Sequence, residues 1–396
     1  MDTTARLDRA ALVEALAKIE PAVDAEPDRA RVVRAPGRVN LIGEHTDYNE
    51  GFVLPAAIDR EIWIAFLPAD DRRVEITIEA TGERASLDLD AIGPRTGTWI
   101  DYVAGTAWAL AEAGIATRGF RGILASTLPA SAGLSSSASL ELASLWALTD
   151  GTGGGTDGLT RARICQRAEN AYVGANVGLM DQFASSLGVR GAALFLDCRT
   201  LAWRPVPIPL ASHALVVCHT GSSRRLVASE YNARRAQCEA AVSVLAGIDP
   251  SIRALRDVTP GMLPEVRARV DEETYRRCEH VVLENGRVLA TVAALEAGDL
   301  AAVGRLFAES HASLRDLYEV SSAELDALVE IANSTPGVVG ARMTGAGFGG
   351  CTINLVARDA IDDLRAAVDR DYSARTGLTP AVFAVEPAVG AGLVTA

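Results

Sequence analysis

The sequence predicts a protein of two domains that mixes α-helices with β-strands. The chain has 396 residues, which is long enough for two domains of ordinary size. Apolar and polar residues alternate at 74–79, as in a half-buried strand, whereas residues 276–331 follow amphipathic helical spacing. Hydrophobic residues make up 49% of the chain and charged residues 22%, a composition typical of soluble globular proteins.

Composition also argues against several classes of function. No apolar run approaches the ~20 residues that span a bilayer, and the N-terminus has no apolar signal core, so we expect no membrane role and a cytoplasmic location. The formal net charge of −13 disfavours binding to nucleic acid. The six cysteines form no C-x-x-C pair and the five histidines have no metal-ligand spacing. We therefore expect reduced, mostly buried thiols.

The expected elements follow one another along the whole chain. We expect helices at 7–20, 99–113, 138–148, 159–174 and 224–246, helices over 276–331 with breaks at Gly298 and Ser321, and strands at 39–42, 52–54, 62–67, 74–78, 87–89, 123–125, 214–218 and 352–356.

Three alternating prolines mark a change in the chain. Pro205, Pro207 and Pro209 disfavour a central strand and suit an edge strand or a linker. We place a domain boundary here, which gives domains of residues 1–205 and 206–396.

The stretch 34–51 carries an unusual density of reactive side chains. Arg38, Glu44, His45 and Asp47 lie within ten residues, directly after a short apolar run. Carboxylates, an imidazole and a guanidinium together suit a ligand with many hydroxyls or a phosphate. A surface turn held by ion pairs would show the same spacing, and spacing alone leaves both interpretations open.

A second stretch, residues 128–139, is rich in small residues. It places the hydroxyls of Ser135–Ser137 before an apolar helical run, and the amino end of a helix is an anion site. An N-capped structural helix is the alternative. Lys18 is the only lysine, so a Walker-type phosphate loop is impossible. Any ATP phosphates must be held by backbone amides, arginine, hydroxyls and metal.

Three further features have both a structural and a functional interpretation. Asp181 follows Gly178 closely and could be a turn former or a helix cap. Tyr231 could be a core aromatic with its hydroxyl hydrogen-bonded. The glycine-rich segment 345–350 is weak evidence of ligand binding when taken alone.

The identity of these residues points to one family. Gly37-Arg-Val-Asn-Leu-Ile-Gly-Glu-His-Thr-Asp-Tyr48 resembles the signature of galactokinases, a branch of the GHMP small-molecule kinases. Residues 128–139 resemble the GHMP phosphate loop, with Ser131 where the family commonly has glycine. Residues 178–183, 229–239 and 337–356 match further galactokinase segments, in the family order, so the resemblance covers about 31–390.

The resemblance implies an α+β, two-domain GHMP kinase fold. The N-terminal domain would resemble domain 2 of ribosomal protein S5, and the C-terminal domain would be ferredoxin-like. The implied reaction transfers the γ-phosphoryl group of ATP to the C1 hydroxyl of galactose, giving α-galactose 1-phosphate and ADP.

The resemblance also implies a role for each matched residue. Asp181 would be the general base, and Arg38 would keep it ionised and stabilise the developing charge. Galactose would be bound by Glu44, His45, Thr46, Asp47 and Tyr231; the ATP phosphates by Ser131, Ala132, Gly133, Leu134, Ser135, Ser136 and Ser137; and Mg²⁺ by Ser137 and Glu169.

Two alternatives remain beside a galactose kinase. One is a kinase for a related sugar, N-acetylgalactosamine or arabinose. The other is a galactokinase-like sensor that binds sugar and ATP without turnover. We expect a monomer or a weak oligomer with galactose as its small-molecule partner.

Overall fold

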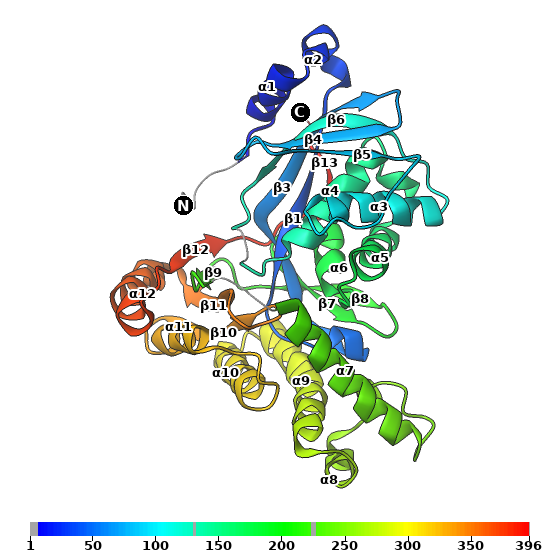
Figure 1. Cartoon of the computed structure of the whole chain (residues 1–396). Helices are drawn as coiled ribbons and strands as arrows, with labels where there is room; N and C mark the ends of the chain where they lie inside the picture. The colour runs from blue at the N-terminus through cyan, green and yellow to red at the C-terminus, as the bar shows by residue number, and fades with distance from the viewer. Residues whose placement is uncertain (1–6, 130–131, 223–226, 396) are drawn as a thin grey trace.

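The computed structural model describes residues 7–129, 132–222 and 227–395 (Figure 1). Its described strands form three sheets, and the two larger ones lie in the upper and lower parts of the view in Figure 1. The larger sheet belongs mainly to the first half of the chain, whereas the four-stranded sheet belongs to the second half.

The larger sheet has the strand order β13-β1-β3-β6-β4-β5. Neighbouring strands are antiparallel except β4 and β6, which run parallel. The predicted alternation at 74–79 is confirmed, since Val74 and Ile76 are buried while Glu75 is exposed. The bounds are β1 Arg31–Asn40, β3 Pro55–Ala69, β4 Arg73–Ile78, β5 Arg84–Asp88, β6 Gly119–Ser126 and β13 Gly392–Leu393.

Helices cover both faces of this sheet because successive strand residues point to opposite sides. Val33 and Ile64 face the core beneath α3 to α6, whereas their neighbours Val32 and Ala65 face α1. Figure 1 shows α1 on the far side of the sheet from α3 and α4. The bounds are α1 Arg9–Ile19, α2 Ala22–Ala25, α3 Ile100–Glu112, α4 Ser136–Leu148, α5 Gly158–Arg167 and α6 Met180–Leu187.

The four-stranded sheet has the order β10-β11-β9-β12, with all neighbours antiparallel. Numbered along the chain, this is the 2-3-1-4 order of a ferredoxin-like fold, with α11 between its first two strands and α12 between its last two. The predicted ferredoxin-like topology is therefore confirmed. The bounds are β9 His213–His219, β10 Val338–Thr344, β11 Cys351–Ala357, β12 Ala381–Val385, α11 Ala323–Asn333 and α12 Ile361–Thr376.

Four further α-helices of the described chain lie between β9 and β10. The predicted break at Gly298 is confirmed, because this glycine ends α9 in the left-handed conformation with φ 72°. The predicted start of a helix at Arg224 lies outside the described residues. The helices are α7 Val227–Ala246, α8 Leu263–Arg267, α9 Glu272–Ala297 and α10 Leu300–Asp316.

A small sheet contains β2 Phe52–Val53, β7 Ala192–Asp197 and β8 Trp203–Pro207, in that order. Pro205 and Pro207 therefore lie on an edge strand, as their missing N–H groups favour. The boundary between residues 205 and 206 stays a prediction. The chain's last described strand, β13, returns to pair with β1 in the first sheet.

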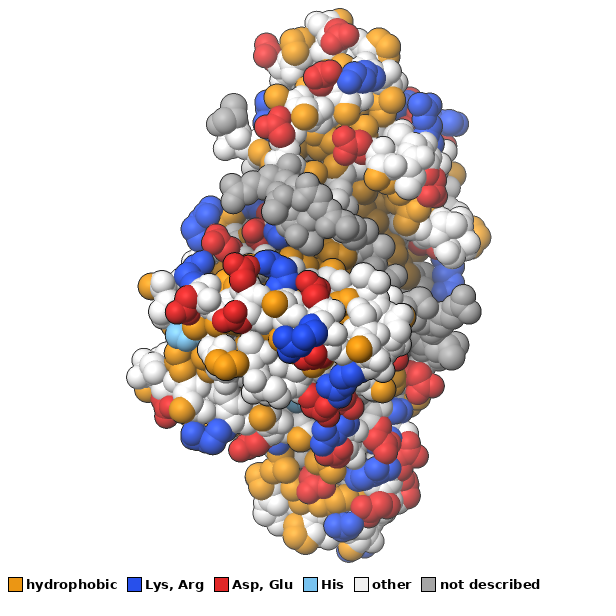
Figure 2. Space-filling view, turned by 90° about the vertical axis from the view of Figure 1, so that its left-hand side faces the viewer, with side chains coloured by type: hydrophobic (Ala, Val, Ile, Leu, Met, Phe, Trp, Pro, Cys, Tyr) orange, Lys and Arg blue, Asp and Glu red, His pale blue; other side chains and the backbone are white. Residues whose placement is uncertain are grey.

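The distribution of charged side chains on the surface and the burial of the cysteines agree with the expectations from composition. On the face shown in Figure 2, acidic and basic side chains are interspersed. Five cysteines are buried and Cys198 is half-buried, and none of these six described residues forms a disulfide, as expected. Within the described ranges, no helix combines the length and apolar character needed to cross a bilayer.

Strand β1 is longer than the predicted run at 39–42 and passes through Gly37. Its register against β3 shifts between Pro36 and Arg38, which is a β-bulge. A Cβ at Gly37 would lie 2.5 Å from the Leu128 side chain and 2.6 Å from the Leu134 carbonyl oxygen. Close approach of Leu128 and Leu134 to β1 therefore requires glycine here.

We predict that Gly37→Ala lowers the free energy of unfolding by roughly 1–3 kcal/mol, because the added methyl overpacks this contact. Urea denaturation measures the change. Gly286→Ala is the matched control, since a Cβ there meets nothing within 4 Å in the middle of α9. The control should stabilise the protein by about 1 kcal/mol. Equal stability of the Gly37 variant and the wild type would contradict the prediction.

Candidate active site

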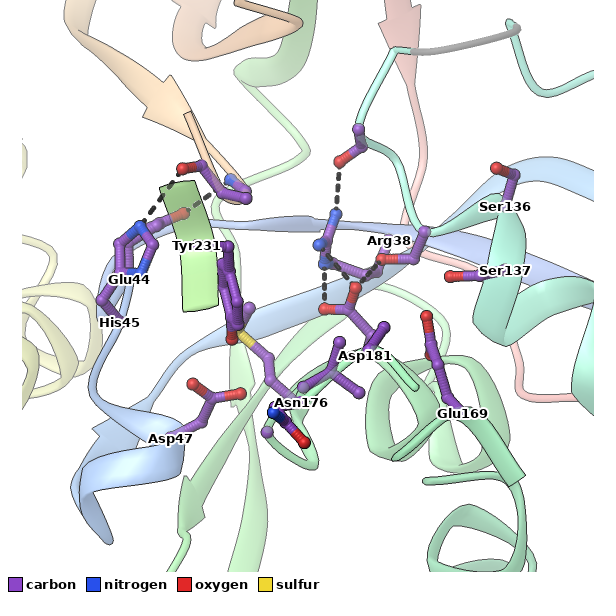
Figure 3. Close-up of a pocket in the computed structure, with 18 of the residues that line it drawn as sticks. Arg38, Glu44, His45, Asp47, Ser136, Ser137, Glu169, Asn176, Asp181 and Tyr231 are labelled. Atoms are coloured by element: carbon purple, nitrogen blue, oxygen red, sulfur yellow. Dashed lines mark hydrogen bonds and ion pairs between the residues drawn. The ribbon is translucent and has the colours of Figure 1, made fainter. Parts of the chain in front are cut away.

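A cavity of about 370 Å³ lies where the two halves of the chain meet. Figure 3 shows Glu44 and His45 on one side, Ser136, Ser137 and Glu169 on the other, and Arg38 and Asp181 between them. The lining residues come from separate segments, namely Arg38, Glu44, His45, Asp47, Tyr102, Gly133, Ser135, Ser136, Ser137, Glu169, Ala175, Asn176, Val177, Gly178, Met180, Asp181, Tyr231, Asn232, Gly345 and Ala346.

An ion pair between Arg38 and Asp181 forms the centre of this cavity (Figure 3). Arg38 Nε donates to Asp181 Oδ1 and Arg38 Nη2 donates to Oδ2, both at 2.8 Å. Arg38 Nη1 donates to the Gly133 carbonyl oxygen at 2.7 Å. The Arg38 side chain is 5% exposed and that of Asp181 25%, so Asp181 is the member of the pair that faces the cavity.

The position of Asp181 excludes one of its interpretations. It is the second residue of α6, whose N-cap is Leu179, so Asp181 does not cap this helix. Its carboxylate instead accepts three hydrogen bonds from other elements, the third from Ser135 Oγ at 2.5 Å. The interpretation of Asp181 as a cap is wrong.

The phosphate-loop segment turns sharply at Ser135, which has a left-handed φ of 62°. Helix α4 begins directly after it, at Ser136, two residues earlier than predicted. The Ser135 hydroxyl makes no capping bond within the described chain and donates to Asp181. Ser135 therefore stands at the N-cap position of α4 without a side-chain capping bond, and the segment delivers its serines to the cavity.

Glu169 lies in a π-helical turn, Ala168–Val173, at the end of α5. Such turns are frequent at functional sites. Its carboxylate accepts hydrogen bonds from the Ser137 hydroxyl and from Gln182 Nε2, the latter at 2.6 Å. Burial, and then the charge of Asp181, raise the pKa of Glu169. Burial and the charge of Glu169 raise the pKa of the neighbouring Glu141 well above its usual value.

This corner fits a magnesium ion held together with phosphate. Glu141 Oε1 has no hydrogen-bond partner in the described part of the chain, and the nearby donors to Glu169 are neutral amide and hydroxyl groups. Among residues 7–129, 132–222 and 227–395, no cluster of three or more His, Cys, Asp or Glu could enclose a metal alone. Mg²⁺ usually takes one or two carboxylates and completes its shell with phosphate oxygens and water.

Asp47 approaches the cavity from the opposite side. Its carboxylate accepts the backbone N–H of Met180 and lies against Gly178, where a Cβ would be only 1.8 Å from Asp47 Oδ2. Glycine at 178 is therefore required for this approach. Burial, and secondly the charge of Asp181, raise the pKa of Asp47 to about 6.

His45 is fixed as a neutral ring by a directed chain of hydrogen bonds. Its Nε2 lies 3.3 Å from the Ala346 carbonyl oxygen, which can only accept, so Nε2 carries the hydrogen. Nδ1 then accepts from the Tyr48 hydroxyl at 2.8 Å, and Tyr48 in turn accepts from Tyr318. Burial, reinforced by His280, lowers the pKa of His45 to about 3.

Glu44 is tied to the second half of the chain. It forms an ion pair with Arg342 of β10 and accepts the Gly345 N–H at 3.0 Å. Both side chains are almost completely buried. Burial raises the pKa of Glu44, and the neighbouring Arg342 opposes that rise.

Tyr231 of α7 closes the same side. Its ring centroid lies 5.5 Å from that of His45 and 5.4 Å from that of Tyr48. Its hydroxyl accepts a hydrogen bond from the backbone of Gly178. Tyr231 is thus an aromatic with its hydroxyl hydrogen-bonded, as the structural interpretation required, and it also lines the cavity.

Not every residue proposed from the sequence reaches the cavity. The Thr46 hydroxyl lies 2.8 Å from the Gly43 carbonyl and 2.6 Å from that of Phe52, so it holds the turn together. Ala132 and Leu134 are buried outside the lining, and Ser131 lies outside the described residues. The roles of all these residues remain predictions.

Sequence reasoning missed several residues that build the site. Tyr102, Asn176 and Asn232 line the cavity, and Tyr48 supports His45. Two further residues, Glu141 and Arg342, could have been found from the sequence. Glu141 is an acid inside an apolar helical run, and Arg342 is a cation between two short apolar runs. A charge in such a position is costly unless it is paired, which marks it for attention.

Three family models match the sequence. They are the galactokinase galactose-binding signature at residues 21–68, the GHMP kinases N terminal domain at 101–189 and the GHMP kinases C terminal domain at 291–374. The galactokinase of Roseiflexus sp. (strain RS-1) is 45% identical over 363 residues, covering 92% of this chain and 93% of that protein. The galactokinase of Chloroflexus aggregans is 45% identical over 350 residues, covering 88% and 90%.

Solved structures agree with these matches. The Lactococcus lactis galactokinase complexed with galactose superposes with a TM-score of 0.89 at 36% identity, covering 96% of this chain and 99% of that one. The Methanococcus jannaschii mevalonate kinase superposes with a TM-score of 0.65 at 18% identity, covering 90% and 98%. The latter likeness concerns the fold alone.

Fold and site together define a small-molecule kinase of the GHMP class, for which ATP is the phosphate donor. The relatives narrow this class further, because their identity to this chain extends over nearly its whole length. The chain belongs to the galactokinase family, the sugar kinases of that class.

We predict that Asp47→Asn stabilises the protein, and more so at higher pH. The native pKa is about 6 against an ordinary 3.8, so between these values the native state keeps a proton that the unfolded state has lost. The wild type therefore loses stability as pH rises through this window. The advantage of the variant in free energy of unfolding should grow by about 1 kcal/mol from pH 5 to pH 7.5. Urea denaturation at both pH values measures it, and a pH-independent difference would contradict it.

Proposed function

We propose that the protein transfers the γ-phosphoryl group of ATP to the C1 hydroxyl of galactose, giving α-galactose 1-phosphate and ADP. The observation that carries the proposal is the Arg38–Asp181 pair, placed between the serine loop and the Asp47–His45 side of one cavity. The 36% identity to a galactokinase that was crystallised with galactose supports this choice of sugar. ATP supply and free thiols favour action in the cytoplasm.

The hydrogen bonds around Asp181 suggest which oxygen takes the proton. Oδ2 accepts from both Arg38 Nη2 and Ser135 Oγ, which uses its two lone pairs. Oδ1 accepts only from Arg38 Nε among the described residues, so one lone pair is open. We assign Asp181 Oδ1 as the general base that accepts the C1 hydroxyl proton.

Arg38 has two functions in this arrangement. It orients Asp181 through two parallel bonds, and its charge would stabilise the negative charge that develops on the sugar oxygen. Asp47, Glu44 and His45 would bind sugar hydroxyls on the opposite side. The Asp47 carboxylate can accept hydrogen bonds, whereas the Nε2 hydrogen of His45 is already directed to Ala346.

Ser137 and Glu169 would hold Mg²⁺ on the ATP phosphates, because together they supply a hydroxyl and a carboxylate oxygen at one corner. When bound, the ion neutralises phosphate charge. The segment 133–137 would receive the phosphates with backbone amides at the start of α4. This arrangement replaces the lysine of a Walker-type loop.

The decisive experiment measures ADP release with ATP, Mg²⁺ and a panel of monosaccharides. We expect kcat/KM for galactose to exceed that for glucose, its C4 epimer, by more than 10²-fold, since a lost hydroxyl contact leaves a buried polar group unpaired. Comparable values for the two sugars would contradict this. Preference for N-acetylgalactosamine or arabinose would indicate a kinase for that sugar. Tight galactose binding with negligible ADP release would indicate a sensor.

A second prediction tests Asp181. Asparagine keeps the shape but cannot take the proton, so Asp181→Asn should lower kcat by roughly 10²–10⁴. Calorimetry should still detect binding of galactose and of ATP. The variant should also lose about 1–3 kcal/mol of stability, because Arg38 loses a charged partner.

Asp157→Asn is the matched control for this variant. Asp157 caps α5 by accepting the Thr160 N–H at 2.8 Å, and asparagine caps nearly as well. The control should keep both stability and kcat close to the wild type. Near-normal kcat in a folded Asp181→Asn variant would show that Asp181 is not the base.

A further inference from the structure

Gln182 is completely buried between two carboxyl groups that come from different elements. It follows Asp181 in α6, and its Nε2 donates to Glu169 Oε2 at 2.6 Å and to Glu141 Oε2 at 3.1 Å. The two hydrogens on one amide nitrogen therefore go to two acidic side chains. The mechanism proposed above uses neither Gln182 nor Glu141.

We propose that Gln182 is a positioning residue that selects the divalent ion. By donating to Oε2 of Glu169, it uses one of the two lone pairs of that oxygen, which disfavours a metal bound through both carboxylate oxygens and so favours Mg²⁺ over Ca²⁺. This inference rests on the proposed function of Glu169 as a metal ligand.

Oε2 of Glu169 already accepts a hydrogen bond from Gln182. The 2.6 Å contact places an amide hydrogen directly on Glu169 Oε2. A cation bound to both oxygens of this carboxylate would meet that positively polarised hydrogen. Ca²⁺ takes six to eight oxygen ligands and often binds a carboxylate through both of its oxygens, whereas Mg²⁺ binds octahedrally through single oxygens. A carboxylate with a hydrogen bond already on one oxygen is therefore a better ligand for Mg²⁺ than for Ca²⁺.

The Gln182 amide is held in this orientation from two sides. Its other amide hydrogen is bound by Glu141, which is 0% exposed within α4. Turning the amide over would place its oxygen against two carboxyl groups. The orientation with nitrogen facing both acids is therefore the stable one.

Helices α4 and α6 are both attached to strand β1. Ser139 Oγ of α4 and Ser185 Oγ of α6 both donate to the Pro36 carbonyl oxygen of β1, at 2.8 Å and 2.6 Å. This shared acceptor fixes α4 and α6 against each other and hence Glu141 against Gln182. A ligand supported by such partners is held in one orientation, and removing a partner typically changes metal affinity 10–100-fold.

The experiment compares metal binding without turnover. Mn²⁺ bound to the protein with a non-hydrolysable ATP analogue is followed by electron paramagnetic resonance, and Mg²⁺ or Ca²⁺ is titrated as competitor. Gln182→Met removes both amide donors at similar volume. We expect the affinity ratio of Ca²⁺ to Mg²⁺ to rise about tenfold relative to the wild type. An unchanged ratio in the folded variant would overturn the inference.

Gln166→Met is the matched control, because the Gln166 amide donates to the Val177 carbonyl at 3.3 Å and to no carboxylate among the described residues. Its ratio should equal that of the wild type, and a tenfold rise there would overturn the inference. If Gln182→Met does not fold, Glu141→Met tests the same idea, since loss of the Glu141 acceptor frees the amide to rotate. For Glu141→Met, a rise in the affinity ratio of Ca²⁺ to Mg²⁺ that is smaller than tenfold supports the inference, and an unchanged ratio overturns it.

The Glu169→Ala variant distinguishes a failure of this inference from a failure of the proposed function. Unchanged Mn²⁺ binding in that variant would show that Glu169 is not a ligand, which overturns both. Loss of Mn²⁺ binding in Glu169→Ala together with an unchanged ratio in Gln182→Met would overturn only the selection by Gln182.

Discussion

One buried guanidinium connects the segments on which the site depends. Arg38 extends from β1, donates to the carbonyl of Gly133 in the phosphate loop and forms two parallel bonds to Asp181 of α6. A buried arginine without its partner would cost several kcal/mol, so the native packing must bring all three segments together. The bulge before Arg38 and the bare backbone of Gly37 give the loop room to approach.

A second buried network ties the sugar side to the other half of the chain. Arg342 of β10 pairs with Glu44 and donates to the Leu41 carbonyl oxygen at 3.0 Å. Glu284 of α9 accepts the Gly43 N–H at 3.1 Å, and Arg287 lies beside it. The loop that carries Glu44, His45 and Asp47 therefore takes its shape from elements that follow it by more than 200 residues.

Acidic groups in and beside the cavity are not fully neutralised by the described part of the protein. Asp47, Glu169 and Glu141 all have raised pKa values because they are buried near other carboxyl groups. Such an arrangement lowers the stability of the free protein, as functional sites often do. Under the proposed function, hydroxyl donors of a sugar and a divalent cation would relieve this repulsion, so their binding would raise the stability of the protein.

The sequence by itself determined the elements and the family. Periodicity placed the strand at 74–78 and the helices over 276–331, Gly298 marked a helix end, and the stretch 37–48 identified the galactokinase resemblance. These features are encoded within a few neighbouring residues, so a local pattern is enough to show them. The local pattern at Ser135 left two interpretations open, because a serine at an N-cap position usually bonds the helix and here its hydroxyl donates to Asp181.

Only the tertiary structure decided which of these residues meet. Arg38 and Asp181 are separated by 143 positions, Glu44 and Arg342 by still more, and the place of Gln182 between two acids depends on how α4 and α6 pack. The Thr46 hydroxyl, by contrast, is kept out of the cavity by local contacts, because it bonds carbonyls of its own turn. The contacts of Arg38, Glu44 and Gln182 follow from the packing of the whole chain, which no short segment of sequence contains.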